Sequence, residues 1–257
     1  MKKKLFLTMT LLATVATMFV ACGEKDDDSG SEVVDLGLPS GTLWAKTNLG
    51  AKKAWDRGDC YAWGETLPKT DFICETYKYC NGTDSSLTKY CNDSNCGKDG
   101  FTDAFTTLEP ADDAANAVLG AGYSMPTEAD WNELLANVVW VWTSNYKEHN
   151  VSGFIAYKAK SSDHKGLRII DDGALSSLYS LTDVHIFFPS TTEESVWMGD
   201  VKAEGRYWSS SIFGHNPLMA SFCYFESGIY DFSSLHGPGC GGMSRYAGCS
   251  VRPVKRP

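Results

Sequence analysis

Cysteines and histidines are the residues of this chain whose chemistry is most easily judged from spacing. The 257 residues include nine cysteines and five histidines. A zinc site needs paired cysteines two to four residues apart, in two sets or combined with histidines. No Cys-x-x-Cys occurs, and no two histidines stand at ligand spacing. The sequence therefore predicts neither a metal site nor a bound cofactor.

The cysteines instead favour disulfides in one stretch and buried thiols elsewhere. Four crowd into a polar segment rich in Gly, Asn, Asp and Ser, where a long irregular loop needs covalent support: Cys74, Cys80, Cys91 and Cys96. We expect disulfides in that segment. Cys60 and Cys249 lie in apolar strand-like runs, where a free thiol packs as a small hydrophobic group.

Loops of the C-terminal third combine aromatic rings with carboxylate, amide and imidazole groups. Aromatic faces stack on sugars, and polar groups hydrogen-bond sugar hydroxyls. The loops are predicted over Ser190 to Glu204, Gly214 to Leu218 and Ser233 to Ser244. The candidate ligand-binding residues are Glu193, Glu194, Trp197, Asp200, His215 and Asn216. For Trp197 the alternative is packing beneath its own loop.

Signatures of hydrolases, zinc proteases and phosphate-binding loops are missing from the sequence. Asp112 and Asp113 do not form a catalytic pair, because neighbours on a helix point about 100° apart. They suit the positive end of a helix dipole, with Pro110 in the opening turn and Gly120 after the last residue. A helix is therefore predicted over 110–119.

A second helix begins after Thr127, which is followed three residues later by Asp130 in a variant of the capping box. Its apolar residues recur at helical spacing and form one stripe that must face a core: Trp131, Leu134, Leu135 and Val138. The alternation of apolar residues over 140–142 then indicates a strand.

Short runs rich in aromatic and β-branched residues, separated by Gly, Pro and Asn, predict the remaining strands. They lie at 33–36, 42–46, 59–64, 153–158, 185–188, 206–211, 219–225 and 246–254. Two helices followed by many strands indicate an α+β fold with a mainly antiparallel, twisted sheet and long loops.

The N-terminus has the pattern of an export signal. Lys2, Lys3 and Lys4 precede an apolar run over 5–20, which ends at Ala21-Cys22. The residues before Cys22 resemble a bacterial lipobox, in which the cysteine is acylated and becomes the new N-terminus; an ordinary signal peptide with an incidental cysteine is the alternative. We therefore expect a signal peptide over 1–21, an acidic flexible tether over 22–31 and one folded domain over 32–257.

Charge excludes one class of partner. Removal of the three lysines in the leader changes the formal net charge from −9 to −12. So acidic a chain repels nucleic acid and anionic lipid surfaces. We expect contact with a membrane through the lipid anchor alone and no binding of nucleic acid.

Six motifs in order carry a family resemblance. They include Gly-Leu-Pro-Ser-Gly-Thr-Leu-Trp-Ala, Tyr-Ala-Trp-Gly-Glu-Thr, Met-Pro-Thr-Glu-Ala-Asp-Trp and Tyr-Trp-Ser-Ser-Ser, and they occupy 34–45, 61–66, 108–115, 125–134, 207–211 and 250–254. Together they resemble the Fibrobacter succinogenes major paralogous domain family of Bacteroidetes lipoproteins. The resemblance implies a fold similar to the C-type lectin domain and to formylglycine-generating enzymes, with first and last strands paired.

Shape does not fix function. The leading hypothesis is an outer-membrane lipoprotein, exposed at the cell surface, whose non-enzymatic lectin-like domain binds an extracellular glycan or protein. The resemblance leaves two alternatives: a formylglycine-generating-type oxidase that uses Cys223, Cys240 or Cys249, and an adhesin or appendage subunit. Calcium motifs typical of C-type lectins, Glu-Pro-Asn and Trp-Asn-Asp, are missing.

Overall fold

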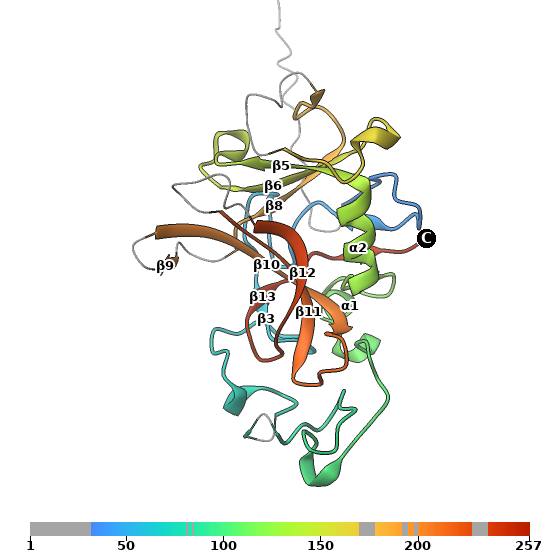
Figure 1. Ribbon diagram of the computed structural model, residues 1–257, viewed down its shortest axis with the longest axis vertical. Helices are drawn as coiled ribbons and strands as arrows, with labels where there is room; N and C mark the ends of the chain where they lie inside the picture. The colour runs from blue at the N-terminus through green and yellow to red at the C-terminus, as the bar shows by residue number, and fades with distance from the viewer. Residues whose placement is uncertain are drawn as a thin grey trace, which may run out of the picture.

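The computed structural model describes residues 32–80, 82–83, 85–169, 178–191, 195–197, 200–227 and 236–257 (Figure 1). Across these residues the fold is α+β and mostly sheet, with three sheets and two α-helices. The predicted fold class is therefore confirmed at this level. The leader, Cys22 and the tether lie outside the described residues.

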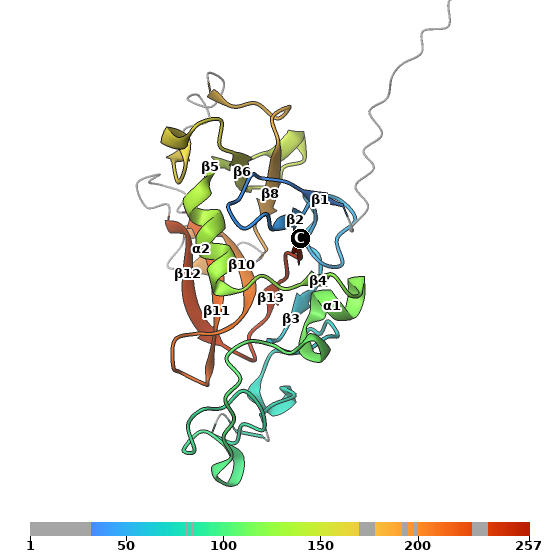
Figure 2. The same ribbon diagram turned by 90° about the vertical axis from the view of Figure 1, so that its right-hand side faces the viewer.

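The first sheet joins the two ends of the described chain. Its strands, in spatial order, are β1 (Val33–Val34), β2 (Leu43–Ala45), β14 (Val254–Lys255) and β4 (Tyr123–Ser124), all antiparallel. The last strand thus pairs with β2, the second strand of the N-terminal hairpin, and not with the first strand as the resemblance implies. Figure 2 shows the C-terminus beside β2 and β4.

The largest sheet carries the long C-terminal strands. Its order is β12 (His236–Ser244), β11 (Met219–Ser227), β10 (Asp200–Ile212), β13 (Cys249–Ser250) and β3 (Cys60–Tyr61), and β9 (Ser195–Trp197) pairs with the start of β10. Pairing is antiparallel except between β10 and β13. Helix α2 (Glu128–Asn137) packs against β10, β11 and β12 (Figure 2).

The third sheet supports the site described below. Its order is β7 (Arg168–Ile169), β5 (Val138–Thr143), β6 (Gly153–Lys158) and β8 (His185–Pro189), with a parallel pair only between β5 and β7. Because side chains alternate along a strand, Trp140 and Trp142 of β5 enter the central core around Trp131. Val139 and Val141 enter a second core on the other face.

Both helices form where capping residues predict them. Thr127 and Asp130 make the reciprocal capping box of α2, and Trp131 is fully buried. Helix α1 (Ala114–Leu119) begins after Asp113, whose carboxylate accepts a hydrogen bond from the Asn116 backbone N–H at 3.0 Å. Pro110 opens a separate 3₁₀ turn, η3 (Pro110–Asp112).

The role assigned to Asp112 from sequence was wrong. Its carboxylate does not cap the helix but accepts hydrogen bonds from Lys78 Nζ at 2.8 Å, Lys89 Nζ at 2.6 Å and the Tyr90 hydroxyl at 2.7 Å. These donors belong to the long segment between β3 and α1. Asp112 therefore anchors that segment to the start of α1.

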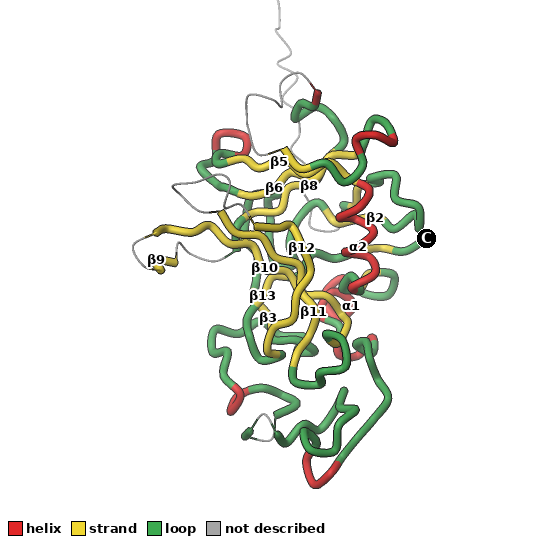
Figure 3. The backbone as a smooth tube through the Cα atoms, viewed as in Figure 1, coloured by secondary structure: helices red, strands yellow, loops and turns green. Residues whose placement is uncertain are grey.

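The segment between β3 and α1 is mostly loop, as predicted (Figure 3). Besides η3, its described residues include the 3₁₀ turns η1 (Cys74–Thr76) and η2 (Lys98–Gly100). A disulfide joins Cys74 and Cys80, which confirms the expectation of covalent support at that pair. Cys91 is buried and hydrogen-bonds the Asp93 carbonyl at 3.1 Å.

Two loops predicted near the C-terminus are wrong in part. In the loop predicted over Ser233 to Ser244, the described residues from His236 onward form strand β12, and the stretch over Ser190 to Glu204 contains β9 and the beginning of β10. Glycine lowers strand propensity, but pairing along β11 overrides it. The predicted loop over Gly214 to Leu218 does connect β10 to β11. The remaining 3₁₀ turns are η4 (Tyr146–Glu148) and η5 (Ser162–His164).

Candidate functional site

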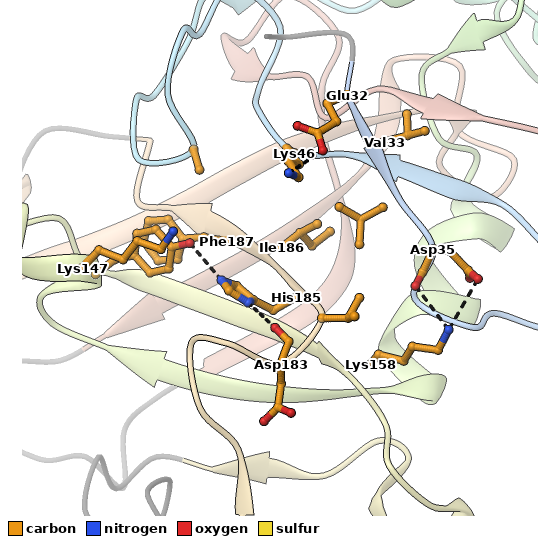
Figure 4. Close-up of a pocket in the computed structure, with 14 residues that line it drawn as sticks. Glu32, Val33, Asp35, Lys46, Lys147, Lys158, Asp183, His185, Ile186 and Phe187 are labelled. Carbon is orange, nitrogen blue, oxygen red and sulfur yellow. Dashed lines mark hydrogen bonds and ion pairs between the residues drawn. The ribbon is translucent and has the colours of Figure 1, made fainter. Parts of the chain in front are cut away.

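A cavity of about 560 Å³ opens between β1 and strand β8 (Figure 4). Its lining comes from distant parts of the sequence: residues 32–35, Lys46, the turn at Tyr146 and Lys147, Lys158, and residues 183–187. The volume lies in the range of small-molecule sites. The cavity is therefore the candidate functional site.

Strand alternation decides which side chains of β8 reach the cavity. Ile186 and Phe188 contribute to the central core, whereas Phe187 belongs to the core on the opposite face and His185 stands beside it. Pairing with β6 fixes the position of His185 opposite Tyr157. The imidazole is consequently held at the cavity by the register of the sheet.

Ion pairs form two sides of the cavity. Lys46 Nζ lies 2.6 Å from a Glu32 carboxylate oxygen, and the Lys46 backbone N–H also donates to the Glu32 carbonyl at 2.9 Å. Lys158 Nζ lies 3.4 Å from Asp35 Oδ2. A hydrogen bond from the Gly37 backbone N–H, and then the Lys158 charge, hold the pKa of Asp35 below its usual value. The paired charges are thus oriented before any ligand arrives.

Gly37 permits the turn that carries Asp35. Its φ of 70° lies in the left-handed region, and an added Cβ would meet the Lys158 side chain at 2.8 Å. The Gly37 N–H donates to Asp35 Oδ1 at 2.7 Å. Glycine here lets Lys158 approach the turn closely.

His185 forms the centre of a hydrogen-bond chain. Its Nδ1 lies 2.7 Å from the Asp183 carbonyl oxygen and its Nε2 lies 3.0 Å from the Tyr146 hydroxyl. Because a carbonyl can only accept, Nδ1 carries the proton and Nε2 accepts from Tyr146. Burial lowers the pKa of His185. The neutral imidazole therefore orients the Tyr146 hydroxyl.

The Tyr146 ring is fixed by stacking and by its turn. It lies parallel to Phe187 with ring centroids 3.9 Å apart. The following turn is bent sharply, with positive φ at Lys147, Glu148 and Asn150. Such backbone angles cost energy in non-glycine residues and are often found at functional sites.

Charges around the cavity balance. The lining includes three lysines, at 46, 147 and 158, and three acidic residues, at 32, 35 and 183. The Asp183 carboxylate is paired with Lys160 Nζ at 2.8 Å, and the apolar part of the lining includes Val33 and exposed Val184. Among the residues that the structure describes, no serine, threonine or cysteine lines the cavity. Within the described part of the chain, no group of three or more metal-ligating side chains occurs. The arrangement can hold a polar ligand by hydrogen bonds.

Of the six residues predicted to bind ligand, His215 and Asn216 are described with their side chains, and neither lines this cavity. Glu193 and Glu194 lie outside the described residues. Trp197 and Asp200 are opposite each other where β9 pairs with β10, at the left of Figure 1, and their side chains lie outside the description. Their role in binding stays a prediction.

His215 and Asn216 lie at the other end of β10. The 12 steps from residue 200 to residue 212 correspond to roughly 40 Å of strand. His215 is exposed, and Asn216 lines a smaller cavity of about 220 Å³ beside Tyr77 and Arg245. The structure thus does not bring His215 and Asn216 together with Trp197 and Asp200.

The three cysteines considered for an oxidase, Cys223, Cys240 and Cys249, have raised thiol pKa values, whereas a reactive cysteine needs a lowered one. Burial raises the pKa of Cys223 and Cys249, and burial followed by the Glu128 charge raises the pKa of Cys240 to about 11. A catalytic thiol needs a depressed pKa. Arg245 instead donates to backbone carbonyls, including those of Lys89 and Pro217.

The residues that form the cavity could not be singled out from the sequence. His185 stands among scattered histidines, and Lys46, Tyr146 and Lys158 match no motif. The strands predicted over 33–36, 42–46, 153–158 and 185–188 contain lining residues, but nothing in the sequence indicated that these strands meet. Sheet pairing, which one sequence does not reveal, brings these residues together.

Searches of protein-family models, curated proteins and solved structures found no match to this chain. None of the helices in the described residues has the length and apolar character required to cross a bilayer.

Proposed function

We propose that this chain is a lipid-anchored protein of the outer membrane that presents a non-enzymatic, C-type-lectin-like module at the cell surface. We further propose that the module binds an extracellular glycan. The leader and Cys22 support the location. The pairing of β2 with β14, together with two helices and mixed sheets, supports the lectin-like assignment.

The balance of charge in the cavity carries the proposal of a glycan. Three lysines and three carboxylates around a neutral imidazole attract neither a strong anion nor a strong cation. Groups held in ion pairs still donate to and accept from hydroxyl groups. A neutral polyhydroxylated ligand satisfies both kinds of partner, and the apolar side chains of Val33 and exposed Val184 suit the C–H face of a sugar ring.

Binding is tested on a glycan array with the chain from residue 32 onward. We expect a subset of neutral glycans to bind, with and without a chelator, because the cavity offers no metal-ligand cluster among the described residues. No signal above background for any glycan would remove this ligand class. A protein captured in place of a glycan would support the adhesin alternative.

Variants of the cavity locate the binding site. Lys46→Ala and Lys158→Ala each remove a donor from the lining and should weaken binding about tenfold or more. Lys52→Ala is the matched control, because Lys52 is exposed and does not line the cavity. Equal affinity of all three variants would place the binding site elsewhere.

The anchor is tested separately. Cys22→Ser removes the only atom to which the acyl chain could be attached by the lipobox, so incorporation of labelled palmitate and recovery in the membrane fraction should both be lost. Cys249→Ser is the control. Palmitate labelling that survives in Cys22→Ser would contradict the proposed anchor.

A further inference from the structure

Two cysteines face each other across the edge of the largest sheet. Cys223 of β11 and Cys240 of β12 are directly paired in the antiparallel register. Opposed residues in such a ladder project to the same face. Cys223 is buried in the central core, and the partly buried Cys240 packs against that core. The two side chains therefore share one environment.

The backbone geometry suits a covalent bond. Directly opposed residues in an antiparallel pair have Cα atoms about 4.5 or 5.5 Å apart. Both separations fall within the roughly 4.4–6.8 Å that disulfides span. Cys60 and Cys249 provide the contrast, because Cys60 is opposite Ser250 and Cys249 is opposite Tyr61. Successive strand residues point to opposite faces, so Cys60 and Cys249 do not meet.

Strand β12 is held weakly by its own residues, so a covalent cross-link would stabilise it. It is the edge of its sheet, and four of its nine residues are glycines. Glycine contributes no side-chain packing and weakens a strand. An added Cβ at Gly239, next to Cys240, would meet no atom within 4 Å. Close to this end, the Arg168 guanidinium donates to the carbonyls of Gly237 and Pro238.

We propose that Cys223 and Cys240 form a structural cross-strand disulfide that fixes edge strand β12 to β11. The two thiols give up two protons and two electrons and form one S–S bond. A disulfide oxidant of the thiol–disulfide exchange class accepts the electrons and becomes a dithiol. Cys223 is buried in the central core and β12 lies beside α2 (Figure 2), so the access of reductants to the bond would be restricted.

Burial affects how readily the two thiols can react. It raises the pKa of both thiols, so the thiolate that exchange requires is scarce once the core has closed. The proposal is independent of the glycan site, and it relies on export only for the natural source of oxidant.

Peptide mapping tests the bond directly. The mature full-length chain is unfolded in guanidinium with N-ethylmaleimide and without reductant, then digested and analysed by mass spectrometry. We expect a linked peptide pair containing Cys223 and Cys240 that disappears after reduction. Maleimide on both residues, or a link from either one to a different cysteine, would overturn the proposal.

Stability gives a second readout. In a Cys74→Ser/Cys80→Ser background, which removes the disulfide at that pair, the chain is refolded with oxidised or with reduced glutathione. Oxidation should raise Tm by roughly 5 to 10 °C, because the bond closes a loop of about 17 residues. Adding Cys240→Ser should abolish the rise, whereas adding Cys249→Ser as control should preserve it. An equal rise of Tm on oxidation in the Cys240→Ser variant would contradict the proposal. This outcome decides the matter even if peptide mapping recovers neither cysteine-containing peptide.

Discussion

The carboxylate of Asp112 holds together parts of the chain more than 20 residues apart. It is buried and accepts from Lys78, Lys89 and Tyr90. Asp112→Asn keeps the shape but loses the charge that pairs with both lysines; Lys89 retains its ion pair with Glu109. Because both lysines are partly exposed, we expect a loss of about 1 to 3 kcal/mol in the free energy of unfolding, measured with urea.

The same carboxylate predicts a dependence on pH. Burial opposes ionisation, but hydrogen bonds from Lys78 and Lys89 outweigh it and hold the pKa of Asp112 far below its usual value. A depressed carboxyl pKa stabilises the fold above the unfolded value near 4, and this contribution is lost as pH falls below it. Asp112→Asn should therefore reduce the fall of the urea midpoint as pH drops below about 4. The substitution Asp163→Asn, at an exposed residue, is the control and should leave that fall unchanged.

His185 predicts a second dependence on pH, in a different window. Burial lowers the pKa of His185 in the folded chain, so the unfolded chain binds the proton more readily. Stability is then full above the unfolded pKa near 6.5 and falls as pH drops below it. His185→Gln should remove part of the loss between pH 7.5 and 5.5. An identical pH profile in the variant would contradict a buried neutral imidazole.

Among the elements, helix α2 was the most predictable and strand β12 the least. Thr127, Asp130 and the apolar stripe are local signals, and they place the start of α2 correctly. Strand β6 also has the predicted bounds, Gly153–Lys158. Strand β12 carries no such signal, because glycines conceal a strand whose existence depends on its neighbour β11.

The capping box of α2 is testable at the scale of the element. Thr127 Oγ1 accepts from the Asp130 backbone N–H at 3.1 Å, and the Asp130 carboxylate accepts from the Thr127 N–H at 2.7 Å. Thr127→Ala should cost about 1 kcal/mol and lower Tm by roughly 2 to 4 °C in a thermal scan. Thr127→Ser retains the hydroxyl and should restore most of the loss. A serine variant as unstable as the alanine variant would argue against capping.

For the whole molecule, the class of fold followed from the sequence but the candidate site did not. Patterns of apolar residues locate strands, and two helices among many strands indicate α+β. The cavity depends on which strands pair: Lys46 follows β2, Lys158 ends β6 and His185 begins β8. Contacts between residues more than 100 positions apart leave no mark in local periodicity.

Arg252 connects these distant parts and provides the prediction for the whole fold. Its buried guanidinium donates to the Asn48 side chain at 2.9 Å, and to the carbonyls of Ala45 at 3.0 Å, Lys46 at 2.7 Å and Phe187 at 2.7 Å. It therefore joins the last part of the chain to β2 and to β8 at the cavity. Only a planar group with several fixed donors reaches all four acceptors.

Arg252→Lys keeps the charge but loses this geometry. The ammonium leaves buried carbonyls without donors, so we expect a loss of about 3 to 5 kcal/mol in the free energy of unfolding. Arg256→Lys is the matched control, because the Arg256 side chain is 42% exposed and should cost less than about 1 kcal/mol. Urea titration measures both. Equal, small losses in the two variants would mean that strand pairing alone, without the Arg252 guanidinium, closes the fold and shapes the cavity.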